Sequence, residues 1–280
     1  MLKFSGWDLY GNGCVIIQQQ GANIIINRFW GVALNTATGV ATQASSAVAL
    51  FVSSLIMALR PTIIKKYAAG DIPGMQNILI VAITLCMMLI GIVAIPLYIK
   101  IEPIMKIWLN DVPQYTVSFC RWMLLANSFG IISSLFTSII HATGRIKALS
   151  LIGGTLYILT LPIIYLLFKY ICRPELAYIV LFVMVICSLV CNILITKNLV
   201  PSLSIKLIMR KILPVVSCLV ITLLFLLLIN PHVPDSFIGC VIMFVLAIIA
   251  SSATLYITWI GPTYGWNILK IYNNLKEMIS

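Results

Sequence analysis

Long apolar stretches alternate with short polar loops along most of this 280-residue chain. A helix needs roughly 20 apolar residues to cross the hydrocarbon of a membrane. The pattern predicts eight transmembrane helices, at residues 8–28, 34–59, 76–99, 115–140, 148–169, 175–196, 212–230 and 237–259. No alternating strand pattern occurs between them, so we expect an all-α integral membrane protein.

The first two predicted helices each carry a polar face. Amide side chains fall within one sector of the first helix, at Asn12, Gln19, Gln20, Asn23 and Asn27. Small and polar residues form a stripe on the second, at Thr36, Gly39, Gln43, Ser46 and Ser53. Because an unpartnered amide in hydrocarbon costs several kcal/mol, we expect these faces to meet each other or to line a water-filled cavity. The substrate-binding candidates among them are Gln19, Asn23, Asn27 and Gln43, while ordinary polar packing between helices explains the pattern equally well.

Arg121 lies well inside the fourth predicted helix, about two turns after Pro113. Ionisable residues at such positions are candidates for function, so Arg121 is a fifth substrate-binding candidate, for an anionic group. The alternative is that its long side chain reaches the outer headgroups. A separate stripe on the same helix is interpreted as a packing surface between helices, and it consists of Asn127, Gly130, Ser134, Ser138 and His141.

The composition is typical of a membrane protein, and it affects how the net charge is interpreted. Hydrophobic residues make up 61% of the chain and charged residues 9%, with a mean hydropathy of +1.10. The formal net charge is +11, but the basic residues stand singly between apolar stretches rather than on one aqueous face. They therefore indicate contact with membrane lipid and not with nucleic acid.

The distribution of Lys and Arg predicts the orientation. Twelve fall on the side of the N-terminus and five on the opposite side, with Arg121 set apart. The positive-inside rule then places both termini in the cytoplasm. Candidates for contact with cytoplasmic headgroups are Arg60, Lys65, Lys66, Arg145 and Lys147.

The loops suggest how the chain is divided. A basic cytoplasmic linker, 201–211, separates a six-helix lobe, 1–200, from two additional helices and a tail, 212–280. Between residues 60 and 71, basic residues with Pro61 and Gly70 predict a loop where the chain leaves the membrane. The outer loop 100–114 is expected to contain a short interfacial helix at 105–109, anchored by Trp108.

Reactive chemistry is not indicated by the residues of this chain. None of the seven acidic residues falls deep in a predicted helix, although Asp8 comes closest, and no supported set of His, Ser and carboxylate occurs. Most of the eight cysteines lie within apolar stretches without a Cys-x-x-Cys spacing. We expect no enzyme, no metal site and no cofactor.

Four local motifs together resemble the bacterial polysaccharide flippases. They are Asn27-Arg28-Phe29-Trp30-Gly31, Pro61 followed by Lys65-Lys66-Tyr67-Ala68-Ala69-Gly70-Asp71, Trp108-Leu109-Asn110-Asp111-Val112-Pro113, and Ala142-Thr143-Gly144-Arg145-Ile146-Lys147. Their order and spacing run over residues 1 to 270. These flippases belong to a superfamily with the multidrug and toxic-compound extrusion transporters and the lipid II flippases.

The resemblance implies a fold and a function. The fold would be a six-helix half-bundle of the extrusion-transporter type with two extra C-terminal helices. Such flippases move undecaprenyl-pyrophosphate-linked oligosaccharide, as in O-antigen and lipopolysaccharide synthesis, across the bacterial inner membrane by alternating access. The chain would be their C-terminal lobe, and it would need a missing N-terminal six-helix half.

Two other functions stay open. A cation-coupled multidrug or small-molecule antiporter would have the same fold, and it is disfavoured because coupling usually needs a carboxylate inside the membrane. A membrane glycan polymerase or ligase is less favoured, because the short external loops offer few reactive residues.

Overall fold

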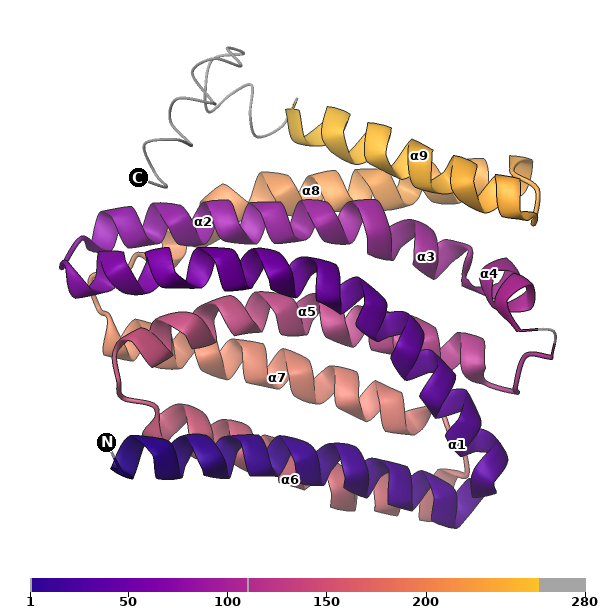
Figure 1. Ribbon diagram of the computed structural model, residues 1–280, viewed down its shortest axis with the longest axis horizontal. Coiled ribbons are helices and arrows are strands. Elements are labelled where there is room, and N and C mark those ends of the chain that lie inside the picture. Colours follow the sequence, from indigo (N-terminus) through magenta and orange to yellow (C-terminus); the bar gives the residue numbers. More distant parts are fainter. Residues whose placement is uncertain (1, 110, 257–280) are drawn as a thin grey trace. The chain divides into compact units, whose positions relative to one another are not determined.

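The computed structural model describes residues 2–109 and 111–256, which form helices without a strand (Figure 1). Their bounds are α1 Leu2–Ala68, α2 Ile72–Leu89, a π-helical segment Ile90–Ala94, α3 Ile95–Ile99, α4 Ile101–Trp108, α5 Thr116–Ala142, α6 Lys147–Ile171, α7 Leu176–Leu199, α8 Ile205–Ile229, a 3₁₀ turn Asn230–His232 and α9 Phe237–Leu255. Seven helical segments of the described chain are long and apolar enough to cross a membrane. The expected all-α membrane protein is confirmed, while Lys270, Lys276 and the end of the last predicted helix lie outside the described residues.

Helix α1 joins the first two predicted helices into one element with a kink. Gly31 has φ 77° and ψ −175°, a conformation that is essentially restricted to glycine. The residues on both sides of Gly31 are helical, so the predicted break at 29–33 is a kink and not a loop. The 65-residue apolar segment Phe4–Ala68 has the length of two membrane crossings.

The predicted loop at residues 60–71 is wrong for most of its length, because α1 continues through Pro61 to Ala68. The helix then ends in a Schellman motif around Gly70, which has φ 73°. The Gly70 N–H donates to the Tyr67 carbonyl, and the Asp71 N–H donates to the Lys66 carbonyl, both at 3.0 Å. Asp71 caps α2 in turn, because its carboxylate accepts from the Gly74 N–H at 2.9 Å.

The described helices form two compact units. The first contains Met1–Ala49 and Asp111–Pro201, and the second contains Leu50–Asn110 and Ser202–Ser280. The first unit therefore combines most of α1 with α5, α6 and α7, whereas the second combines the end of α1 with α2, α3, α4, α8 and α9. The predicted domains 1–200, 201–211 and 212–280 divide the chain differently, and they stay a prediction.

In the first unit, the two parts of α1 pack on different helices. Before the kink, α1 packs on α6, where a methyl group added at Gly21 would meet Leu161 at 2.7 Å. After the kink, the Thr38 hydroxyl accepts a 2.7 Å hydrogen bond from Tyr178 of α7. Thr38 lies outside the predicted stripe, whose residues Thr36, Gly39, Gln43 and Ser46 are exposed, so the described residues do not show the two polar faces of α1 buried against each other.

In the second unit, α8 and α9 pack beside α2 (Figure 1). Gly91 makes this close approach possible, because an added methyl group would come within 2.7 Å of Leu219 on α8. Gly91 lies in the π-helical segment that precedes Pro96. Proline cannot donate its backbone hydrogen bond and collides with the carbonyl four residues earlier, so a local π-bulge accommodates it.

Helices α4 and α8 differ from the bounds that the sequence predicts. Helix α4 confirms the short helix near Trp108, but begins four residues earlier than predicted, at Ile101. Helix α8 begins at Ile205, so most of the predicted linker 201–211 is helical. Ser204 starts α8, because its hydroxyl accepts from the Leu207 N–H at 3.3 Å.

Candidate functional site

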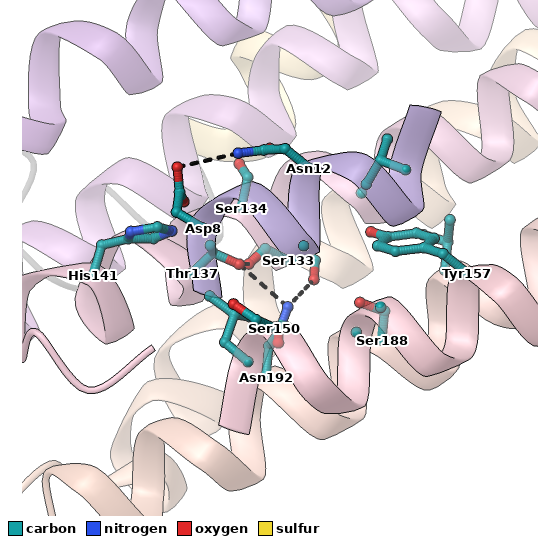
Figure 2. A pocket seen from close by; sticks show the side chains of 17 residues that line it. Asp8, Asn12, Ser133, Ser134, Thr137, His141, Ser150, Tyr157, Ser188 and Asn192 are labelled. Carbon is teal, nitrogen blue, oxygen red and sulfur yellow. Dashed lines mark hydrogen bonds between the residues drawn. The ribbon is translucent and has the colours of Figure 1, made fainter. Parts of the chain in front are cut away.

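A polar cavity of about 230 Å³ lies within the first unit, between α1, α5, α6 and α7. Figure 2 shows its polar side chains projecting from these four helices toward one another. The polar lining residues are Asp8, Asn12, Ser133, Ser134, Thr137, His141, Ser150, Tyr157, Ser188 and Asn192. A space of this size and polarity suits several water molecules or a small hydrophilic ligand.

Glycines form part of the wall and explain the hollow. Gly11 and Gly154 lie where α1 and α6 approach closely, and a methyl group at Gly154 would come within 2.8 Å of Tyr10. Gly153 also lines the cavity, but a methyl group there would have no atom within 4 Å. Gly154 therefore lets α1 and α6 approach closely, whereas Gly153 leaves space open.

Asn192 connects α7 to α5, two of the four helices that line the cavity. Its amide nitrogen donates to the hydroxyl oxygens of Ser133 at 2.9 Å and Thr137 at 3.2 Å, both on α5 (Figure 2). Asn192 is 5% exposed, and its backbone carbonyl accepts from the Thr196 hydroxyl at 2.7 Å. Because the buried amide is hydrogen-bonded, it costs little and fixes the positions of the two hydroxyls.

Asp8 places a carboxylate at the cavity wall. It is half-buried, and its Oδ2 accepts a 3.2 Å hydrogen bond from the Asn12 amide (Figure 2). The half-buried His141 also lines the cavity and packs edge-on against Phe4, with the ring centroids 6.2 Å apart. A carboxylate among hydroxyls can hold a proton or a monovalent cation, although the described residues contain no group of three or more typical metal ligands.

The predicted substrate-binding residues lie mostly elsewhere on the first unit. Gln19, Asn27 and Gln43 are exposed on α1, and Asn23 is half-buried there. The neighbouring amide that is buried is Gln18, which is 7% exposed and which the predicted face did not include. Arg121 is half-buried on α5.

The stripe interpreted as a packing surface on α5 has two roles. Asn127 packs as expected, because its amide donates to the Ser45 carbonyl of α1 at 3.3 Å. Gly130, Ser134 and His141 instead line the cavity. Asn12 of the predicted amide face also lines the cavity. The signal in the sequence that points to the rest of the site is the single amide of Asn192 in the apolar segment 175–196.

The predicted headgroup residues lie at helix ends. Arg60, Lys65 and Lys66 occupy the last turns of α1, and Lys66 forms an ion pair with Asp71 at 3.4 Å. The backbone N–H of Gly74 holds the pKa of Asp71 below its ordinary value, and Lys66 adds to this effect. Arg145 and Lys147 are exposed at the start of α6.

The fold and the cavity define this chain as a multi-pass α-helical membrane protein. In comparisons with known proteins, no family model, no curated protein and no solved structure matches this chain.

Proposed function

We propose that this chain is the C-terminal lobe of a flippase that moves undecaprenyl-pyrophosphate-linked oligosaccharide across the bacterial inner membrane. The observation that carries the proposal is the exposure of amide side chains on α1, at Gln19, Asn27 and Gln43. These residues belong to a helical segment with the hydropathy of a membrane span. An amide that faces hydrocarbon is costly, so these side chains need a polar partner outside the described unit.

A glycan meets that need chemically. Sugar hydroxyls donate and accept hydrogen bonds, and so do Gln and Asn side chains. A second six-helix half would supply the other wall of a translocation path, since alternating access requires one bundle to move against another. The proposal therefore includes such a half as a partner.

Arg121 is proposed to contact the pyrophosphate. A guanidinium group binds phosphate oxygens in a bidentate geometry that a lysine cannot reproduce. Its half-buried position on α5 leaves part of the side chain accessible to a ligand.

The proposal is tested in a bacterial strain that lacks its polysaccharide flippase. We expect this chain to restore surface polysaccharide when it is expressed with the N-terminal six-helix half of a flippase. Restoration by the chain alone would contradict the need for a second half. No restoration by the pair, at normal membrane abundance, would contradict the flippase function.

A cation-coupled antiporter of small molecules is the second candidate, and Asp8 favours it. Coupling usually needs a carboxylate inside the membrane, and no acidic residue falls deep in a predicted helix. Asp8 nevertheless lines a polar cavity between four helices, where a proton or a cation can bind.

Substitutions in the cavity distinguish this candidate. We expect Asp8→Asn and Gly153→Val to abolish uptake driven by a proton or sodium gradient, because one removes the charge and the other fills open space. Gly13→Val is the control, since Gly13 lies on the same helix as Asp8, does not line the cavity and has equally open surroundings. Unchanged gradient-driven uptake in both cavity variants would contradict coupling at this site.

A further inference from the structure

We propose that the start of α6 forms a binding site for an anionic phospholipid, with Arg145 and Lys147 at the phosphate and an apolar hollow below them for an acyl chain. This inference does not depend on the flippase function. It requires only that the first unit is embedded in a membrane.

The headgroup end of the site contains two exposed cations and one indole ring. The Lys147 ammonium group lies 5.7 Å from the centre of the Trp7 ring, at cation–π distance. Arg145 follows the turn at Gly144, which has φ 69°. Within the described residues, neither cation has an acidic partner within 4 Å.

The local electrostatics favour an anion at this end of α6. Arg145 and Lys147 are two residues apart in the sequence at the start of a helix, where the helix dipole adds further positive potential. Ile146 precedes the helix and provides no side-chain hydrogen bond to its free N–H groups. A phosphate would reduce the repulsion between the two cations.

The hollow supplies a second and independent observation. It is a shallow, open depression of about 280 Å³ on one face of α6, lined by Leu151, Ile152, Thr155 and Leu156. Lys147, Leu151 and Thr155 follow one another at intervals of four residues, so the hollow continues the stripe of α6 that begins at Lys147. From Lys147 to Leu156 the helix rises about 14 Å, a distance that an acyl chain easily spans.

Aromatic residues of α1 border the same region. The rings of Trp7 and Tyr10 pack edge to face, with centroids 6.3 Å apart. Tyr10 in turn packs close to Gly154, next to Thr155 of the hollow. Trp and Tyr are typical of the depth at which headgroups meet hydrocarbon, so the cations and the hollow lie on the expected sides of that boundary.

The combination selects a phospholipid over a free anion. Arg145 and Lys147 alone would accept any phosphate, and the hollow alone would accept any acyl chain. The cations and the hollow follow one another along one face of α6. This order fits a molecule that joins a phosphate to an acyl chain, an anionic phospholipid such as phosphatidylglycerol.

Lipid binding to the full chain in detergent, measured by native mass spectrometry, tests the proposal. The probe is phosphatidylglycerol, with phosphatidylcholine of the same acyl chains as the zwitterionic comparison. We expect the double variant Arg145→Gln/Lys147→Gln to bind phosphatidylglycerol about tenfold more weakly or worse. We also expect Thr155→Trp to weaken binding with both cations present, because the indole fills the hollow.

Lys169→Gln is the matched control at the other end of α6. Lys169 also lies over an aromatic ring, 5.9 Å from the centre of Tyr170, but stands at the C-terminal end, where the helix dipole favours a cation. This variant should bind phosphatidylglycerol as the wild type does. All substituted side chains are exposed, and circular dichroism establishes that each variant is folded.

Three outcomes would overturn the proposal. The first is equal binding of phosphatidylcholine and phosphatidylglycerol by the wild type. The second is an unchanged affinity in the folded double variant. The third is displacement of the lipid by millimolar inorganic phosphate, which would reduce the site to a simple anion site.

Discussion

Asn192 and Ser133 are joined across the first unit by a hydrogen bond of 2.9 Å, from the side-chain amide of one to the hydroxyl of the other. The same amide donates to Thr137, and all three side chains line the polar cavity. The contact therefore holds α7 against α5 and at the same time fixes the polar groups that a ligand in the cavity would meet.

Asn192→Leu is expected to lower the free energy of unfolding by about 1 kcal/mol, because it removes the donor to two hydroxyls and leaves the Ser133 hydroxyl buried. Thermal unfolding in one detergent measures the change. Asn198→Leu is the control, since Asn198 is exposed on the same helix. Equal stability of the two variants would contradict a structural role for this network.

The loop before α9 is expected to lose stability in acid. The buried Lys100 donates to Asp235 at 2.7 Å and to the Val233 carbonyl at 2.9 Å. The hydrogen bond from Lys100, and then its charge, hold the pKa of Asp235 below the ordinary value of 3.8. A carboxyl with a lowered pKa in the folded state stabilises the fold above its ordinary pKa, and this contribution is lost as the pH falls through the folded value.

Melting temperatures of the wild type and Asp235→Asn between pH 3 and pH 7 check this expectation. At neutral pH the wild type should melt at a higher temperature than Asp235→Asn. The difference between their melting temperatures should shrink as the pH falls below about 4. A difference that stays constant over this range would assign the effect to packing instead of charge.

Both termini are expected in the cytoplasm, since twelve of the 18 Lys and Arg residues lie on that side of the predicted topology. Reporter fusions after Ser202 and after Asp235 should give signals from opposite sides, because α8 crosses between them. Both positions lie outside helices, whereas a fusion after Lys211 would interrupt α8. Signals from the same side would contradict the topology.

Substitutions of Arg121 distinguish a role in ligand binding from a role in anchoring at the membrane surface. If it contacts pyrophosphate, Arg121→Lys should reduce glycan transport and Arg121→Ala should reduce it further, by on the order of 2 kcal/mol or more. If it only reaches the headgroups, Lys should replace it fully. Transport at matched membrane abundance decides between these outcomes, and normal transport by both variants would contradict a ligand role.

The sequence predicted the helices well because a membrane span depends on local hydrophobicity. It failed at Gly31 and Pro61, where residues that usually end a helix are followed by more helix. At Gly31 the backbone of this one residue accounts for the change in direction of α1. Near Pro61, the helix continues to Ala68 and ends in the turn at Gly70, where the chain can adopt a positive φ.

The cavity could not be predicted in the same way. Asp8, Asn192 and Gly153 belong to three helices that are far apart in the sequence, and only packing brings them to one space. The sequence shows the amide residues on α1, but it does not show which helix packs beside them. The second part of α1 contacts α5 and α7 through Ser45 and Thr38. The stripe residues Thr36, Gly39, Gln43 and Ser46 lie beside these and are exposed.

The proposed flipping of a lipid-linked oligosaccharide is measured directly in proteoliposomes. The chain is reconstituted with the N-terminal half of a flippase, and the glycan that becomes accessible on the other leaflet is measured over time. We expect flipping to be faster than in protein-free liposomes, markedly reduced in the triple variant Gln19→Leu/Asn27→Leu/Gln43→Leu, and unchanged in Asn198→Leu. Flipping no faster than in protein-free liposomes, or an equal rate in the triple variant, would contradict this expectation.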